Sequence, residues 1–149
     1  GYINYSHENY GSAFRLLLEA ANDGYPKAQQ YVGLCYQEGH GVIKNSFKAF
    51  DWFCMSAEQG YDVAQYSVGY CYHIGFGVRQ DDSRAFEWFK KAAEQKNELG
   101  LLWTGYCYHY GVGVERDYDL AEEYYSAAVE LGNTKAMNRL VDLHRDRGY

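Results

Sequence analysis

Clustered positive charge is scarce in this 149-residue chain. Its 14 Lys and Arg residues are outnumbered by 20 Asp and Glu residues, the formal net charge is −6, and the longest basic run is the pair Lys90-Lys91. Affinity for nucleic-acid phosphates and for anionic membrane surfaces depends mainly on clustered cations. The sequence therefore disfavours nucleic acid and anionic lipid as partners.

Long apolar runs are also missing. No segment approaches the roughly 18–20 apolar residues that a helix needs to cross a bilayer, and the first residues do not have the pattern of a signal peptide. We therefore expect no insertion into a membrane. A phosphate-binding motif is lacking as well, because the glycines stand in short G-x-G segments without a preceding strand.

What the chain does contain is a unit of 36 residues that repeats without a gap at 25–60, 61–96 and 97–132. Residues 9–24 match the second half of this unit and residues 133–149 match the first half, so we expect the sequence to be a section of a longer array. Repeats of 20–50 residues are typical of arrays in which each unit buries its apolar face against its neighbours. The shared positions include Gly33/Gly69/Gly105, Cys35/Cys71/Cys107, Tyr36/Tyr72/Tyr108, Gly39/Gly75/Gly111, Gly41/Gly77/Gly113, Val42/Val78/Val114 and Ala49/Ala85/Ala121.

Each unit predicts two helices joined by a short glycine loop. The first helix is expected over about 26–38, because apolar residues recur there every fourth position on one face. Gly39 is expected to end it, since C-caps favour the left-handed conformation. A glycine in mid-helix costs roughly 1 kcal/mol relative to alanine, so Gly33 predicts that another helix backbone passes close by.

The second helix is expected to begin after an Asn or Asp, whose side chain accepts a hydrogen bond from an otherwise unpaired N–H group. These N-cap positions are Asn45, Asp81 and Asp117 in the full units and Asn9 in the first half unit. Gly60 and Gly132 end the second helix in two of the units, whereas Lys96 stands at that position in the other. The total is eight helices.

The recurring pattern is A-x3-[L/V]-G-x2-Y-x2-G-x-G-V-x2-[D/N]-x3-A-x2-W, with local substitutions such as Gly100 for the first alanine. Over residues 9–147 it resembles the Sel1-like repeat family, which is related to tetratricopeptide repeats. The resemblance implies an all-α fold, a right-handed superhelix (solenoid) of about four helix-pair repeats. Members of this family act as adaptors and scaffolds, so the resemblance implies a protein–protein interaction segment of a larger protein rather than an enzyme.

In the register shared with tetratricopeptide repeats, the first helices line a concave wall. Several of their solvent-facing positions carry aromatic, aliphatic or histidine side chains where exposed helices usually carry Lys, Glu or Gln. A contiguous apolar patch of this kind is typical of an interaction site. An offset of one residue in the register would instead place some of these side chains in the core. The expected contacts with a partner peptide or protein are Leu34, Tyr66, Tyr70, His73, Ile74, Leu102, Tyr106, His109 and Tyr110.

The cysteines predict no disulfide along the array. Equivalent atoms of neighbouring units lie about 9–10 Å apart, whereas a disulfide needs Cα atoms closer than about 7 Å. Cys35, Cys71 and Cys107 therefore cannot bridge, and Cys54 stands alone on a second helix. Four reduced thiols favour a reducing compartment, and we expect a cytoplasmic location.

Metal or nucleophilic chemistry has little support in the sequence. The pairs Cys71/His73 and Cys107/His109 are two residues apart, and such positions on a helix point in different directions. We therefore expect no metal, cofactor or catalytic residue. Two alternatives remain open: a hydrolase activity, as proposed for some cysteine-rich relatives, and a structural role in which flanking repeats or a second copy fill the groove.

Overall fold

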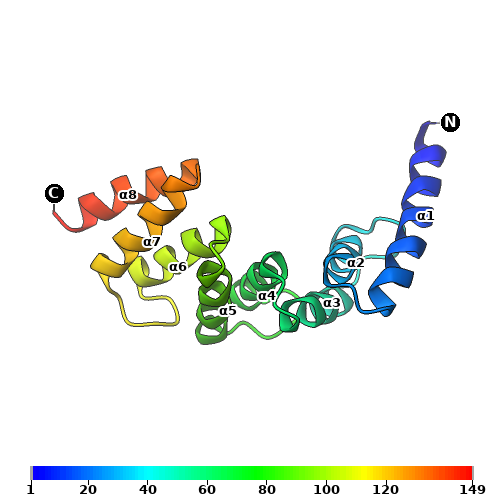
Figure 1. Cartoon of the computed structure of the whole chain (residues 1–149), viewed down its shortest axis with the longest axis horizontal. Helices are drawn as coiled ribbons and strands as arrows, with labels where there is room; N and C mark the ends of the chain where they lie inside the picture. The colour runs from blue at the N-terminus through cyan, green and yellow to red at the C-terminus, as the bar shows by residue number, and fades with distance from the viewer. Residues whose placement is uncertain (1, 149) are drawn as a thin grey trace. The chain divides into compact units, whose positions relative to one another are not determined.

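The computed structural model describes the backbone of residues 2–148 and the side chains of residues 10–148. Residues 2–148 form eight α-helices and no strand, which confirms the expected all-α class (Figure 1). We call α2, α4, α6 and α8 the A helices, and α1, α3, α5 and α7 the B helices. Their bounds are α1 Tyr2–Asn22, α2 Pro26–Glu38, α3 Ser46–Glu58, α4 Asp62–Ile74, α5 Asp82–Glu94, α6 Glu98–Tyr110, α7 Tyr118–Glu130 and α8 Thr134–Asp146.

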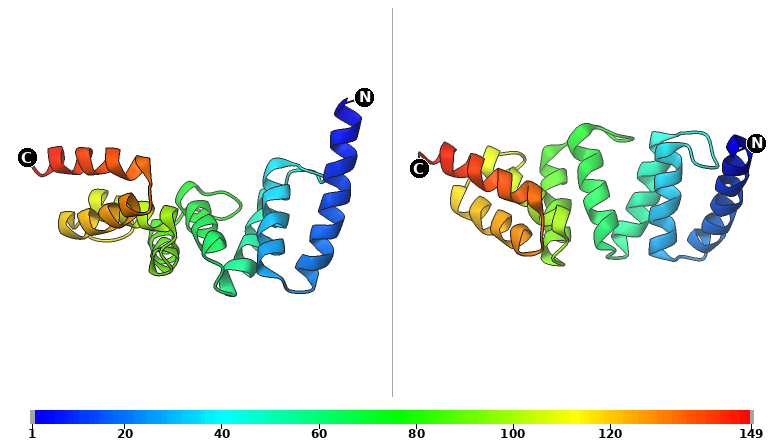
Figure 2. Two further views of the ribbon diagram at one scale, coloured as in Figure 1. Left: turned by 45° about the horizontal axis from the view of Figure 1, so that its top comes forward. Right: turned by 90° about the horizontal axis from the view of Figure 1, so that it is seen from above.

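The helices group into two compact units. The first, Gly1–Gln80, contains α1 to α4, and the second, Asp81–Tyr149, contains α5 to α8. Within each unit, consecutive helices pack side by side and alternate in direction (Figures 1 and 2). None of the described helices combines the length and the apolar character that crossing a membrane requires.

The ends of the helices lie where the sequence predicts them in all three full repeats. The side-chain oxygens of Asn45, Asp81 and Asp117 each accept a hydrogen bond from the N–H group three residues later, at 3.0, 3.1 and 3.0 Å. Gly39 ends α2 in the left-handed conformation, with φ 74°. Lys96, which replaces a glycine, adopts the same conformation with φ 61°. The repeat therefore fixes the turn even where a side chain disfavours it.

The sequence predicts the wrong start for α1, the B helix at the beginning of the chain. Helix α1 does not begin after a cap at Asn9 but runs from Tyr2 to Asn22, 21 residues where every other helix has 13. The residues before Asn9 lack the G-x-G loop that reverses the chain before each of the other B helices. Nothing in this stretch ends or turns a helix, so the helix continues through it.

Gly33 is required by a close approach, although its nearest neighbour is a side chain rather than a backbone. A Cβ at this position would lie 2.5 Å from Cε1 of Phe53 and 3.2 Å from the carbonyl oxygen of Ala49, both on α3. In the second unit a Cβ on Gly105 would lie 2.6 Å from the ring of Tyr125 on α7. The mid-helix glycine thus makes room for an aromatic ring of the following B helix.

Gly41 fixes the contact between one helix pair and the B helix before it. Its φ of 77° is left-handed, and a Cβ here would collide with the backbone carbonyl of Tyr10 on α1. Gly77 meets the carbonyl of Ser46 on α3 in the same way, and Gly113 meets that of Asp82 on α5. Each loop therefore rests directly on the backbone of the preceding B helix.

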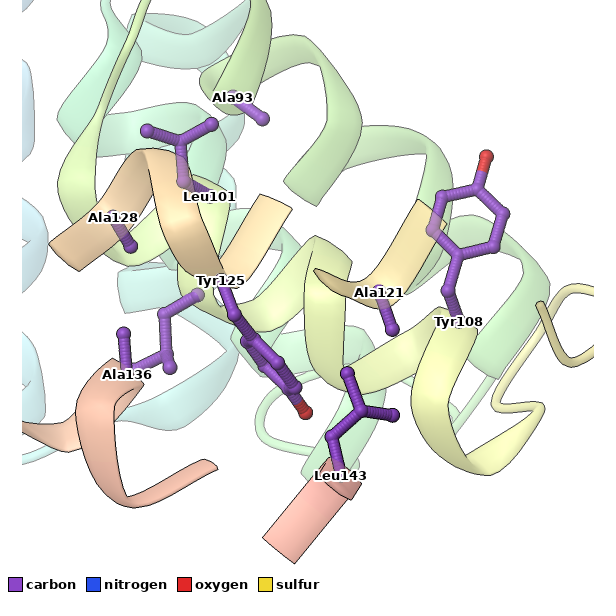
Figure 3. Close-up of a cluster of buried hydrophobic side chains, with 9 residues drawn as sticks. Ala93, Leu101, Tyr108, Ala121, Tyr125, Ala128, Ala136 and Leu143 are labelled. Atoms are coloured by element: carbon purple, nitrogen blue, oxygen red, sulfur yellow. The ribbon is translucent and has the colours of Figure 1, made fainter. Parts of the chain in front are cut away.

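Each unit has its own apolar core. In the second unit, buried alanines let α5 to α8 approach closely, and Tyr125 projects from α7 toward Leu143 of α8 (Figure 3). In the first unit, Phe14 of α1 packs with Ala28 and Val32 of α2. The inward positions of the helices are occupied by these cores. The two units therefore differ mainly at the outward positions of their A helices.

Candidate functional site

A pocket of about 390 Å³ opens between the A helices α2 and α4 in the unit Gly1–Gln80. Helix α2 contributes two side chains, α3 contributes one ring, and the loop after α4 contributes another ring. No residue that lines it carries a formal charge. The lining residues are Leu34, Gln37, Phe53, Tyr66, Ser67, Tyr70, Cys71, Ile74 and Phe76.

Helix α4 supplies the exposed part of the pocket wall. Tyr66, Tyr70 and Ile74 are spaced by four residues, so they lie on one face of the helix. The rings of Tyr66 and Tyr70 have centroids 6.1 Å apart and planes tilted by 32°. Tyr70 is 38% exposed and Ile74 is 52% exposed. The result is an apolar surface in contact with solvent, beside a hollow that extends below it.

The polar side chains of Gln30 and Ser67 lie beside the pocket and are hydrogen-bonded to each other, but one atom of Gln30 has no partner. The Gln30 side-chain amide donates to Ser67 Oγ at 2.9 Å, and Ser67 Oγ donates to the Val63 carbonyl at 3.1 Å. The Gln30 Oε1 atom is buried and has no hydrogen-bond partner. An unmade hydrogen bond of this kind costs about 1–3 kcal/mol.

The thiol in the pocket wall is neutral. Burial, with a smaller contribution from nearby Cys54, raises the pKa of Cys71 to about 12. The wall therefore offers uncharged groups at neutral pH. A site of this composition favours a neutral apolar group, because a buried charge without a partner is costly.

Side chains of α8 cover part of the matching face of the second unit, which we call the closed face. The positions 72 residues after the nine lining residues are occupied by Tyr106, His109, Tyr125, Asn138, Arg139, Asp142, Leu143, Asp146 and Gly148. The guanidinium of Arg139 on α8 lies 5.2 Å from the centroid of the Tyr106 ring on α6. A cation over an aromatic face is attracted by the negative face of the ring, so Arg139 covers the tyrosine that corresponds to Leu34.

His109 closes the rest of this face through two hydrogen bonds. Its Nδ1 lies 3.0 Å from the hydroxyl oxygen of Tyr125, and its Nε2 lies 2.7 Å from Oδ2 of Asp146. A carboxylate only accepts, so in the neutral ring Nε2 carries the proton and Nδ1 accepts from the tyrosine hydroxyl. Burial raises the pKa of Tyr125, which keeps this hydroxyl protonated. The three groups join α6, α7 and α8.

Four of the nine expected contact residues come together at the pocket: Leu34, Tyr66, Tyr70 and Ile74. His73, on α4, is half-buried and does not line the pocket. Tyr106 is half-buried, and Tyr110 is 43% exposed with its ring 4.7 Å from that of Tyr106. Arg139 therefore covers Tyr106, whereas much of the Tyr110 side chain stays in contact with solvent.

The expected solvent exposure is not found for Leu102 and His109, which are only 6% and 1% exposed. Gln30, at the position equivalent to Leu102, is 3% exposed, so this position faces the interior in both units. An A helix packs against B helices on two sides, and its buried arc is therefore wider than the register assumed. His109 is buried for a local reason, because Asp146 and Tyr125 enclose it.

Five pocket residues lie outside the set of contacts that the sequence predicts: Gln37, Phe53, Ser67, Cys71 and Phe76. Phe53 lies on the second helix of its repeat, and its ring forms a wall of the pocket. Ser67 and Gln37 carry no apolar signal. Phe76 has an apolar signal: it is the large apolar ring between the two glycines of a G-x-G loop, where His40 and Val112 stand in the other repeats.

The thiols are poorly suited to nucleophilic chemistry. Burial raises the pKa of Cys35, and it raises the pKa values of Cys54, Cys71 and Cys107 to about 12. The thiolate is the reactive form, so these side chains are protonated at neutral pH. Among the described residues all four cysteines are free, and no group of three or more His, Cys, Asp or Glu is placed to hold a metal ion.

A comparison with models of protein families finds the same repeat that the pairs of helices show. The model of the Sel1 repeat matches residues 6–25, 26–61, 62–97 and 98–133. The chain belongs to the Sel1 repeat family. A search of curated proteins found no match for this Sel1 repeat protein.

Solved structures of other Sel1 repeat proteins are similar to it. The protective antigen c5321 of uropathogenic Escherichia coli is 38% identical, with a TM-score of 0.86, over 91% of this chain and 29% of that one. A Sel1 repeat protein from Oxalobacter formigenes is 33% identical, with a TM-score of 0.82, over 89% of this chain and 54% of the other. The present chain thus spans about half of the second protein and less than a third of the first.

The cysteine-rich protein B of Helicobacter pylori has the same fold. It is 24% identical, with a TM-score of 0.68, and the match covers 84% of this Sel1 repeat protein and 95% of that chain. At this identity the likeness concerns the fold alone.

Proposed function

We propose that this Sel1 repeat protein is a protein–protein interaction module, and that the pocket between α2 and α4 receives an apolar side chain of a partner peptide or protein. Sel1 repeat proteins are commonly interaction scaffolds. The observation that carries the proposal is the uncharged pocket of about 390 Å³ with Tyr70 and Ile74 exposed at its edge.

The size and chemistry of the pocket suit a single large anchor side chain. Ligand pockets commonly measure about 300–1,000 Å³ and are mostly apolar, and this one lies at the lower end of that range. Tyrosines are over-represented among the residues that dominate binding energy, because they bury a large area and keep a polar tip in water. Tyr70 has both properties.

The experiment uses a random-peptide library displayed on phage, selected on the wild-type chain. We expect the selected peptides to share an aromatic or large aliphatic residue. Fluorescence anisotropy with a labelled selected peptide then compares variants. Tyr70→Ala removes the ring at the pocket edge and Ile74→Glu adds a charge there, and both side chains are exposed enough for the variants to fold.

We expect each substitution to weaken peptide binding by about 30-fold, which corresponds to about 2 kcal/mol for a residue that dominates binding. Tyr25→Ala is the matched control, because Tyr25 is 64% exposed and lies outside the pocket. It should bind as the wild type does. Peptides that bind Tyr70→Ala and Ile74→Glu with wild-type affinity would place the interaction elsewhere on the chain and refute the proposal.

A further inference from the structure

Two large apolar side chains stand at the start of α3, where the fold leaves them in solvent. Ile43, in the loop between α2 and α3, is 89% exposed, and Phe47, in the first turn of α3, is 71% exposed. Val42 packs against the core, and its neighbour Ile43 points to solvent. Ala49 is fully buried, and residues two apart on a helix do not share a face. Ile43 and Phe47 therefore add little to the packing of this unit.

The positions of Ile43 and Phe47 are exposed in every full repeat. Their equivalents, all four of them exposed, are Arg79 and Ser83 in the second repeat and Glu115 and Asp119 in the third. Helices precede and follow these two repeats in the chain, so the exposure of both positions belongs to the fold itself. Polar and charged residues are the usual occupants of such positions. Of the three full repeats, only the first places an apolar pair there.

The charges around the apolar pair have one sign. Each of the two side chains is followed directly by an exposed lysine, Lys44 and Lys48. Residues 39–50 contain no Asp or Glu, although the whole chain has a formal net charge of −6. Glu38 and Asp51 are the nearest acidic residues along the sequence and lie beyond the two ends of this segment. The start of α3 is therefore a basic region of an acidic chain.

This combination of side chains fits a protein partner better than a membrane. Sites that bind anionic lipid typically carry clusters of about 4–8 Lys or Arg, whereas residues 39–50 carry two lysines. Protein interfaces have an apolar centre, in which aromatic residues are enriched, and a polar rim. Ile43 and Phe47 have the character of such a centre, and the two lysines have that of its rim. A positive rim is complementary to carboxylates on the partner.

We propose that Ile43, Phe47, Lys44 and Lys48 form a second interaction surface, outside the pocket between α2 and α4, that binds an acidic protein segment. In this segment, apolar residues lie beside Asp or Glu. The apolar residues pack on Phe47 and Ile43, and the carboxylates pair with the two lysines. Apolar contacts at the centre of an interface mainly slow dissociation, whereas charges at the rim mainly speed association. The two parts of the surface are therefore separable by kinetics.

A random-peptide library displayed on phage finds such segments. The library is first depleted on the Phe47→Ser variant and then selected on the wild type, each as the 149-residue chain. The depletion removes peptides that bind the pocket between α2 and α4, because Phe47 does not line it. We expect the surviving peptides to be richer in Asp and Glu than the starting library, with these residues beside aromatic or aliphatic ones. Since the Phe47 side chain is exposed, the variant should keep the wild-type circular dichroism and urea midpoint.

Stopped-flow fluorescence with a labelled surviving peptide separates the two contributions. Ile43→Ser, which takes no part in the depletion, should weaken binding by about tenfold, mostly through faster dissociation. The double variant Lys44→Gln/Lys48→Gln should slow association by about fivefold at low salt, and this difference should vanish at about 1 M salt. Lys27→Gln/Lys135→Gln is the matched control, because it removes the same charge at two exposed lysines outside the segment. It should leave the association rate nearly unchanged.

Four outcomes would overturn the proposal. The first is a selection in which no peptide survives the depletion, and the second is a set of survivors without an excess of Asp and Glu. The third is sedimentation of the wild type, but not of Phe47→Ser, with vesicles of phosphatidylserine, since this would assign the apolar pair to a membrane surface. The fourth is a dimer in sedimentation equilibrium that Phe47→Ser abolishes, since the occupant would then be a second copy of the chain. We expect the wild type to remain in the supernatant and the mass to be independent of Phe47.

Discussion

The faces of the A helices in the two units are formed by helices of equal length and differ in what covers them. Between α2 and α4 a hollow of about 390 Å³ is open to solvent. At the equivalent face of α6 and α8, Arg139 lies over Tyr106, and His109 bonds to Tyr125 and Asp146. A few substitutions account for the difference: Phe53 becomes a tyrosine, Gln37 a histidine and Ile74 an aspartate. In this fold, substitutions at equivalent positions therefore accompany the difference between a face with a pocket and a covered face, and α6 and α8 also approach each other more closely than α2 and α4.

The largest effect should come from the closed face. In His109→Ala the Tyr125 hydroxyl loses its partner inside the core and a cavity is left behind, so we expect a loss of about 3 kcal/mol of stability. Gln37→Ala, the matched change in the open unit, should alter stability by no more than about 0.5 kcal/mol. Amide hydrogen exchange read by mass spectrometry reports α6–α8 and α2–α4 separately. Equal protection losses in the two variants would contradict the assigned role of His109.

A smaller effect separates the two mid-helix glycines. In Gly105→Ala the new methyl group meets the Tyr125 ring, which its hydrogen bond to His109 holds in place. We expect a loss of about 1–3 kcal/mol, the usual range for an overpacked core. Gly33→Ala meets the Phe53 ring, which borders the pocket and has room to shift, so its loss should be clearly smaller.

The pair of glycine variants is measured by urea denaturation. Gly11→Ala serves as the control, because a Cβ at that helical position has no atom within 4 Å. It should leave stability unchanged or raise it by up to about 1 kcal/mol. If Gly33→Ala proved as harmful as Gly105→Ala, the pocket would not relieve strain around Phe53.

The smallest expected change in stability comes from a substitution that copies a residue of one unit into the other. Gln30→Leu places in the open unit the residue that occupies the equivalent position, Leu102, in the closed unit. It removes the unpartnered Oε1 atom at the expense of the hydrogen bond to Ser67. We expect a gain of about 1 kcal/mol, since an unmade buried bond outweighs the net worth of one made. A measurable loss in urea denaturation would mean that Oε1 has a partner in solution.

Local features of the fold were predictable because the responsible residues act over short distances. The glycine at position 39 and the caps at Asn45, Asp81 and Asp117 specify helix ends through their own backbone and side-chain bonds. Asn9 misled the prediction because a cap residue requires a chain that is already turning. No glycine loop precedes Asn9, so the helix passes through it.

The candidate site was less predictable because it depends on neighbours that are distant in sequence. Spacing by four residues correctly placed Tyr66, Tyr70 and Ile74 on one face. Whether such a face is open depends on the next A helix, 37 residues away, as the contact of His109 with Asp146 shows. The burial of Leu102 depends in the same way on helices on both sides of α6. Periodicity within one helix does not contain this information.

The contact of each G-x-G loop with the preceding B helix has a mechanical consequence. Gly41, Gly77 and Gly113 each lie so close to a backbone carbonyl of the preceding B helix that an added Cβ would collide with it. The contact between each loop and the helix before it is therefore rigid, because it is made by backbone atoms. A methyl group there would have to push the loop away from the helix before it, and it would also strain the left-handed backbone of the glycine.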